Sequence, residues 1–280
     1  MNILLEKYLA VDEAWYAQFI RTLGGNAATS KIEIPKVEYH AANSLSQREL
    51  YWLGIDSAKN MDGKLVAVIP VRGFLAPYWN YSGTNTEWLA EQMKIAADNV
   101  NVVSIVNKFN TPGGAVNGTS GCAEIVAKAA KVKPVISYTP YFCASAGLWL
   151  DAAATERWIL SKTTTAKGSL GVMATYISQA EKLKNEGYDV RVLRSAGSEN
   201  KNLLNPMEPI DEKALAEEQK LINSMRQEFL GFVLQNCPKV SANIGGEMYY
   251  GSGIITAGLA DKVGNLEDVI KRAFYLGLNA

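Results

Sequence analysis

Histidine is almost absent from this sequence, which contains only His40. A metal site built from several histidines is therefore excluded, and a Ser-His-Asp or Cys-His mechanism would need His40 itself. His40 lies in a mostly polar stretch, residues 38–43, of the kind that forms a surface connection. A hydrolase with this sequence therefore needs another side chain as its general base.

Cysteine and long apolar runs are also scarce. The three cysteines, Cys122, Cys143 and Cys237, are too few and too scattered for a disulfide framework or a zinc site, and we interpret them as buried residues in a reducing compartment. The N-terminal residues 1–23 lack the basic start and apolar core of a signal peptide, and no stretch approaches the roughly 18 apolar residues of a membrane span. We therefore expect a cytoplasmic protein without a membrane anchor.

An excess of either charge is missing too, because Lys plus Arg and Asp plus Glu both total 28. No overall field favours binding to nucleic acid or to an anionic membrane. Hydrophobic residues make up 48% of the chain and charged residues 20%, which is typical of a globular protein.

Predicted strands and helices alternate from about residue 61 onward, which indicates an α/β domain with a largely parallel sheet. Residues 1–60 are predicted to be a helical N-terminal appendage, and residues 61–280 the main domain. The predicted strands are 64–75, 102–106, 134–138, 157–160, 171–176, 188–193 and 247–250. The predicted helices are 86–99, 118–130, 144–154, 177–186, 211–235, 253–258 and one from residue 266.

A glycine pair, Gly113 and Gly114, follows the predicted strand 102–106 and precedes a helix. A tight turn alone would explain such a pair. At this position, however, backbone amides without bulky side chains could also stabilise an oxyanion.

Ser145 also follows a buried strand and opens a helix, with small residues on both sides. The serine could merely cap that helix. The small neighbours favour a second interpretation, in which the hydroxyl is a nucleophile and the Ala146 amide completes an oxyanion hole with Gly113 and Gly114. Cys143 is the rival nucleophile, but it has no nearby histidine to activate it.

Six segments, in this order, resemble the SppA-type signal peptide peptidases, a family that includes the capsid assembly proteases of tailed phages and prophages. The resemblance runs from about residue 66 to the C-terminus. The segments are Val66–Gly73 (first core strand), Asn110–Gly114 ("NSPGG", with Thr for Ser), Ala144–Gly147 ("ASGG", with Ala for the first Gly), Gly168–Val172 ("GSIGV"), Gly197–Pro206 (lysine loop) and Gly246–Asp261 (C-terminal motif).

The resemblance implies a crotonase/Clp-protease-like fold and a Ser-Lys dyad, with Ser145 as nucleophile and Lys201 as base. It further implies that Ser169, in the "GSIGV" segment, hydrogen-bonds the lysine. The lysine loop is longer and more polar here than is usual in the family, so Lys167 and Lys162 remain alternative bases. A neutral lysine can accept the serine proton and return it to the leaving amine, so the implied chemistry needs no metal and no cofactor.

The resulting hypothesis is a serine endopeptidase that acts on a protein or peptide, either in phage capsid maturation or as a soluble signal-peptide-peptidase-like protease. Two alternatives are a crotonase-type acyl-CoA enzyme and an inactive scaffold of the same fold. The resemblance also implies a homo-oligomer in which each site takes its serine from one subunit and its lysine from the neighbour. The expected location is the bacterial cytoplasm or the phage prohead.

Overall fold

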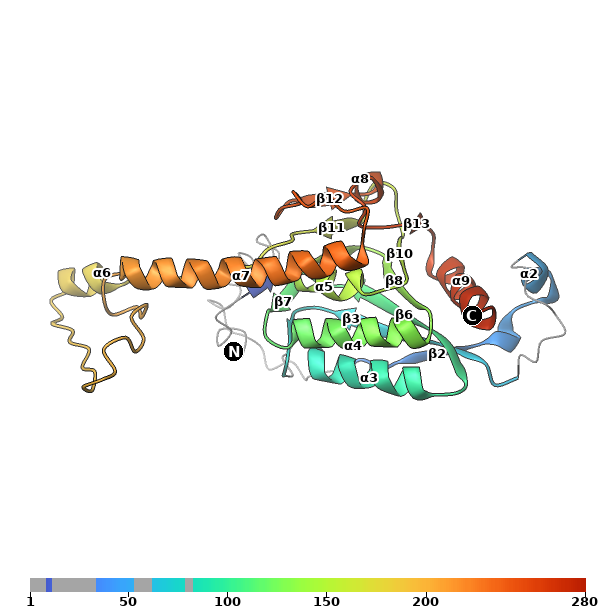
Figure 1. Ribbon diagram of the computed structural model, residues 1–280, viewed down its shortest axis with the longest axis horizontal. Coiled ribbons are helices and arrows are strands. Elements are labelled where there is room, and N and C mark those ends of the chain that lie inside the picture. Colours follow the sequence, from blue (N-terminus) through green and yellow to red (C-terminus); the bar gives the residue numbers. More distant parts are fainter. Residues whose placement is uncertain (1–8, 12–33, 53–61, 79–82) are drawn as a thin grey trace.

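A six-stranded sheet forms the centre of the protein in a computed structural model that describes residues 9–11, 34–52, 62–78 and 83–280 (Figure 1). The strand order is β13-β10-β8-β6-β3-β2, and every neighbouring pair is parallel except β2 and β3. The mostly parallel sheet with flanking helices confirms the predicted α/β class. The strands are β2 (Glu38–Ala41), β3 (Leu65–Arg72), β6 (Val102–Asn110), β8 (Val135–Thr139), β10 (Glu156–Ile159) and β13 (Lys262–Val263).

Helices cover both faces of this sheet because its central strands are apolar on both sides. The larger cluster of buried side chains joins one face to α3 (Thr86–Asp98), α4 (Thr119–Val132), α5 (Ala146–Ala152) and α7 (Glu212–Asn236). The smaller cluster packs α9 (Leu266–Leu278) on the opposite face. The Asn265 and Asp268 side chains form a capping box that fixes the start of α9.

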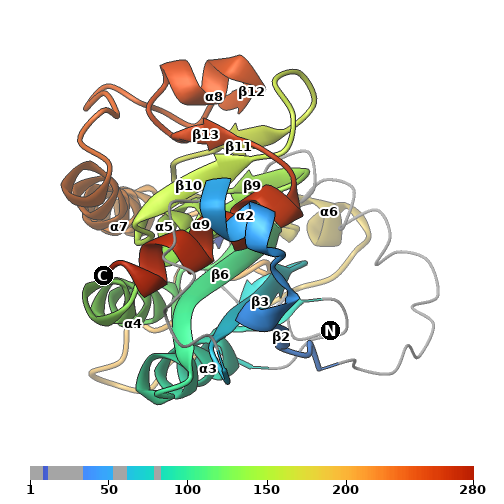
Figure 2. The same cartoon turned by 90° about the vertical axis from the view of Figure 1, so that its right-hand side faces the viewer.

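Two small sheets extend this core. The first has the order β1-β7-β4-β5, and the second has the order β12-β11-β9. Figure 2 shows β12 and α8 (Ser252–Thr256) at one end of the molecule and α3 at the other. The bounds are β1 (Leu9–Val11), β4 (Leu75–Ala76), β5 (Thr84–Asn85), β7 (Gly113–Ala115), β9 (Phe142–Ala144), β11 (Ala166–Gly168) and β12 (Met248–Tyr250).

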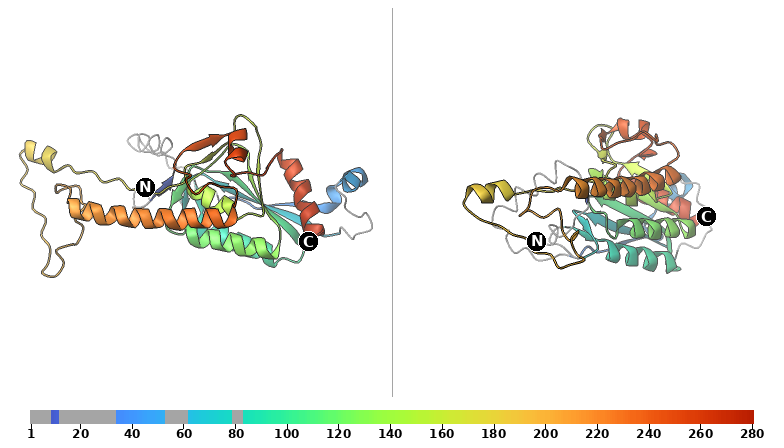
Figure 3. Two further views of the ribbon diagram at one scale, coloured as in Figure 1. Left: turned by 45° about the horizontal axis from the view of Figure 1, so that its top comes forward. Right: turned by 60° about the vertical axis from the view of Figure 1, so that its left-hand side comes forward.

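Residues 172–211, here called the arm, project from the body beyond the N-terminal end of α7 (Figures 1 and 3). The arm contains α6 (Ala180–Asn185). The buried residues of α7 are Phe229, Leu230 and Val233, all in its C-terminal half, so its N-terminal half extends toward the arm. The predicted strands 171–176 and 188–193 are wrong, since neither forms a strand. Their β-branched residues supply propensity, but a strand also needs a neighbour's backbone hydrogen bonds.

Residues 34–52 supply β2, the short helix η2 (Ala42–Ser44) and α2 (Gln47–Trp52). Because β2 is the edge strand of the central sheet and Ala42 and Leu50 are buried, these residues pack directly on the main domain. Most of the expected helical appendage lies outside the described residues, so the boundary at residue 60 stays a prediction. Within the described residues, no helix is both long and apolar enough to cross a membrane.

Candidate active site

Ser145 occupies a strained turn between β9 and α5. Its backbone dihedrals, φ 52° and ψ −117°, are uncommon for a residue with a side chain, and such strain persists only where the surroundings enforce it. The hydroxyl makes no capping hydrogen bond to α5, so the helix-cap interpretation fails. A serine held this way, between a strand and a helix, has the backbone context of a nucleophile.

Two neighbouring segments hold this turn. The Ser145 amide donates to the Gly168 carbonyl at 2.9 Å, and the Ala144 amide donates to the Thr111 carbonyl at 3.0 Å. A Cβ on Gly147 would lie 2.5 Å from the Thr111 side chain, which explains the small residue there. The structure therefore brings together the three motif segments that contain Thr111, Ser145 and Gly168.

The glycine pair forms β7, next to this turn. Gly113 has φ 98°, and its amide donates to Thr111 Oγ1 at 3.1 Å, so it would serve an oxyanion as a shared donor. A Cβ on Gly114 would lie 2.0 Å from the Leu75 carbonyl oxygen, so only glycine fits. Ala146 begins α5, where the first amides of a helix have no partner within that helix.

Ser145 is closed off from solvent, with only 1% of its surface exposed. Its Oγ lies 3.4 Å from the Gly171 carbonyl oxygen. Ser169 follows Gly168, whose carbonyl accepts the Ser145 amide, and the Ser169 amide donates to the Glu247 carbonyl at 2.9 Å. A substrate would have to open this region to reach the hydroxyl.

Lys167, one of the alternative bases, is fully buried in an ion pair. Its Nζ donates to Asp151 Oδ1 at 2.7 Å and Oδ2 at 2.6 Å, and both side chains are 0% exposed. The Ser137 hydroxyl also donates to Asp151. The amine is thus committed to a carboxylate, which argues against its acting as the base. Sequence reasoning missed Asp151, although an acid amid the apolar residues 148–154 was a signal.

The rival nucleophile, Cys143, is buried in β9. Burial raises the pKa of its thiol well above its usual range, with the Asp151 carboxylate adding to the effect. A thiol with a raised pKa is not a thiolate at neutral pH and is therefore a poor nucleophile. This favours Ser145 over Cys143.

Lys201 is exposed and belongs to the arm, residues 172–211, which projects from the body (Figure 3). Its amide donates to the Ser198 carbonyl at 3.0 Å. The structure does not bring Lys201 to Ser145 within one chain. Lys162, the other alternative, is exposed next to β11, and its carbonyl accepts a hydrogen bond from the Ser252 amide.

A polar network shapes the loop that contains Lys201. Arg194 donates to the Lys201 carbonyl at 2.6 Å and to the Asn202 carbonyl at 3.1 Å. The same guanidinium pairs with the Glu208 carboxylate, which also accepts from Asn205. Hydrogen bonds from Arg194 and, to a lesser extent, from Asn205 lower the pKa of Glu208 to about 2, so Glu208 stays charged at neutral pH. Sequence reasoning missed this network, whose members are spread along the loop.

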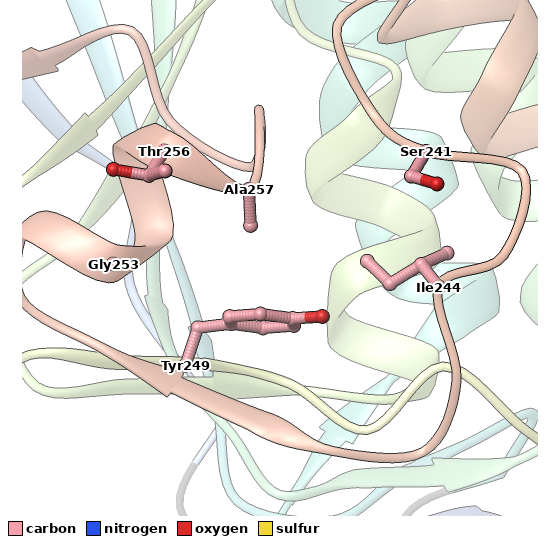
Figure 4. Close-up of a pocket in the computed structure, with 6 residues that line it drawn as sticks. All are labelled: Ser241, Ile244, Tyr249, Gly253, Thr256 and Ala257. Atoms are coloured by element: carbon pink, nitrogen blue, oxygen red, sulfur yellow. The ribbon is translucent and has the colours of Figure 1, made fainter.

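Figure 4 shows a pocket that is lined by other residues. Its volume is about 340 Å³, and its walls come mainly from β12, α8 and the segment before β12. Tyr249 and Ile244 supply its larger apolar surfaces. None of the predicted site residues lines it. Within the described residues, no group of three or more His, Cys, Asp or Glu side chains could hold a metal ion.

A serine in a strained strand-to-helix turn, next to a glycine strand, on a mostly parallel α/β sheet, defines the class as a serine hydrolase. Residues 127–276, more than half of the chain, match the model of peptidase family S49. The chain belongs to peptidase family S49 and is in the class of serine peptidases.

Relatives from phages and bacteria agree with this family. Capsid assembly protease C of Escherichia phage lambda is 29% identical over 222 residues, 73% of this chain and 48% of the relative. Head-tail preconnector protein GP5 of Enterobacteria phage P21 is 25% identical over 274 residues, 94% of this chain and 54% of the relative. Protease 4 of Salmonella typhi is 24% identical over 199 residues, 69% of this chain and 31% of the relative. The chain spans about half the length of the two phage proteins.

Proposed function

We propose that this chain is an endopeptidase that uses Ser145 as nucleophile and Lys201 of a neighbouring subunit as base. The strained Ser145 turn is the single observation that carries the proposal. Ser145 Oγ attacks the scissile carbonyl carbon while the neutral lysine takes its proton, and the same lysine returns the proton to the leaving amine. Water then hydrolyses the acyl-serine ester. The amides of Ala146, Gly113 and Gly114 face the developing oxyanion, and Ser169 hydrogen-bonds the lysine.

Two features of the arm support the proposal that the active site is shared between subunits. The arm presents Lys201 away from its own Ser145, and it exposes apolar side chains that a monomer has no reason to leave in water. The exposed fraction is 67% for Ile177, 62% for Tyr188 and 92% for Leu193. An arm that reaches a neighbour would bury these side chains and deliver the base. Repetition of this head-to-tail contact would close a ring.

The proposed role is the maturation of phage or prophage capsids, which places the activity in the bacterial cytoplasm or the prohead. It rests on the names of the lambda and P21 relatives. The match to Protease 4 keeps a cellular peptidase of the same family as the second candidate. Incubation of the purified chain with phage head proteins and with exported bacterial precursors, followed by mass spectrometry of the products, separates the two.

Mixing Ser145→Ala and Lys201→Ala subunits tests the shared site. Each variant alone is expected to be inactive. Random co-assembly in equal amounts should restore about a quarter of the sites, because a working site needs one particular choice at each of two adjacent positions. Turnover of a peptide substrate, with co-assembly verified by native mass spectrometry, provides the measurement.

The matched control mixes wild-type subunits with the doubly substituted Ser145→Ala, Lys201→Ala chain in equal amounts. A shared site again leaves about a quarter of the sites active, whereas a site within one chain leaves about half. Activity of one half here, together with no recovery in the first mixture, would place the dyad within a single chain.

The rate is expected to rise with pH, because the base works only as a neutral amine and loses its proton as the pH increases. The measurement is kcat/KM against pH over the range in which the protein stays folded. His40→Ala is the control and should leave both rate and profile unchanged, since His40 lies on β2 and its Nε2 is 3.8 Å from Glu38. A rate that falls as the pH rises, or a large loss in His40→Ala, would contradict a lysine base.

Arg194→Met is expected to lower kcat by about 10- to 100-fold with little change in KM. The substitution removes the hydrogen bonds that hold the Lys201 and Asn202 carbonyls, so the base loses its fixed position, and small misplacements of catalytic groups cost about this much. Arg191→Met is the matched control, because Arg191 is exposed and, among the residues that the structure describes, pairs only with Asp189 two residues away. Equal effects of the two substitutions would exclude a positioning role for Arg194.

A further inference from the structure

The strand β7 has a neighbour on each side. On one side, Leu75 of β4 is paired with Gly114 in a parallel arrangement. On the other side, β1 pairs antiparallel with β7, and Val11 lies opposite Gly113. The two further pairs in this register are Ala10 with Gly114 and Leu9 with Ala115. A segment from the start of the chain therefore occupies the edge that β4 leaves free.

β7 lies close to the proposed nucleophile, Ser145. Thr111, two residues before β7, forms a β-bridge with Cys143, two residues before Ser145. We expect a peptide whose carbonyl is attacked by Ser145 to pass along β7 in an extended form. Extended peptides commonly bind by adding a strand to a sheet edge, with backbone hydrogen bonds supplying the affinity. β7 itself contains two of the proposed oxyanion donors, Gly113 and Gly114.

We propose that Leu9–Val11 is an intramolecular ligand of this edge of β7 and competes there with extended peptide substrate. The inference rests on the proposed function of Ser145. The 1% exposure of Ser145 fits a site that is closed while the segment is bound. In this state the enzyme binds substrate only in the fraction of molecules from which β1 has left β7.

The short pairing of β1 with β7 can compete with substrate because both strands belong to one chain. Three residue pairs alone form a marginal strand pairing. Because the segment belongs to the same chain, however, the pairing is intramolecular, and intramolecular pairing can correspond to an effective concentration on the order of millimolar. If it is bound in about 90% of molecules, only about one tenth can accept substrate, and the apparent KM rises about tenfold. A longer substrate, with more backbone hydrogen bonds, could displace it.

Two proline variants of the full chain test the competition. Successive residues of a strand point their N–H groups to opposite sides, so of Leu9→Pro and Ala10→Pro one removes a hydrogen bond to β7 and the other removes an N–H that points away. The proline that removes the hydrogen bond to β7 should lower KM for a peptide substrate about tenfold with kcat unchanged. Ala10→Thr, which keeps a strand-forming residue, should match the wild type.

A second measurement does not depend on turnover. In a Ser145→Ala background, the disruptive proline should speed amide hydrogen exchange at residues 113–115, whereas Ala10→Thr should not. Unchanged KM and unchanged exchange in both proline variants would overturn the inference. If, in that case, the proline variants with Ser145 intact still label at Ser145 and cleave peptide, the proposed peptidase function stands without the competition by Leu9–Val11. Faster exchange in a chain that cleaves nothing would support the strand site and refute the peptidase function.

Discussion

Replacing Ser145 with alanine is expected to lower kcat by at least about 10⁴-fold. The hydroxyl is the group that forms the acyl bond, and loss of a serine nucleophile leaves only the contribution of binding and the oxyanion donors. The strained turn should survive the substitution, because backbone hydrogen bonds to Gly168 and Thr111 hold it. Peptide turnover provides the rate. Intact-mass analysis after fluorophosphonate labelling should show one adduct in the wild type and none in Ser145→Ala.

The matched control is Cys143→Ala, which removes the rival nucleophile two residues away. Its thiol is buried with a raised pKa, so labelling and turnover should stay within a few-fold of the wild type. Full labelling of Ser145→Ala would show that another residue is the nucleophile. A loss in Cys143→Ala as large as that in Ser145→Ala would revive the thiol mechanism.

Asp151→Leu is expected to destabilise the fold by about 3–5 kcal/mol, because it leaves the Lys167 ammonium buried without a counter-charge. The effect should reach the active site as well. Asp151 lies on α5, which begins directly after Ser145, while Lys167 lies on β11, whose Gly168 accepts the Ser145 amide. Urea unfolding followed by tryptophan fluorescence measures the loss, since Trp149 on α5 stacks on Phe229 of α7 at 4.6 Å.

The double variant Asp151→Leu, Lys167→Met separates charge from packing. Replacing both members of a buried ion pair with apolar residues is often neutral, so the double variant should regain most of the lost stability. Part of the loss should remain, because the Ser137 hydroxyl no longer has its acceptor. A double variant no more stable than Asp151→Leu alone would show that shape at this position, and not the unpaired charge, sets the cost.

The sequence by itself determined the α/β class and the elements that bear the predicted nucleophile. Apolar runs such as β3 and β6 are long enough to be buried on both faces, and helices follow them in regular alternation. The small residues around Ser145 predicted a tight strand-to-helix turn, and β9 and α5 form one there. These features depend on local composition and spacing, which the sequence states directly.

Only the tertiary structure decided which lysine is buried in an ion pair and which is exposed. Lys167 directly precedes a glycine-containing motif and Lys201 follows a glycine-containing turn, yet Lys167 is buried against Asp151 and Lys201 is exposed on the arm. The two strands predicted at 171–176 and 188–193 do not form, and Met173 is a single bridge position rather than part of a strand. The pairing of β1 with β7 joins residues about a hundred positions apart. Ion pairs and strand pairings of this kind depend on which distant segments meet, and that is set by the packing of the whole chain.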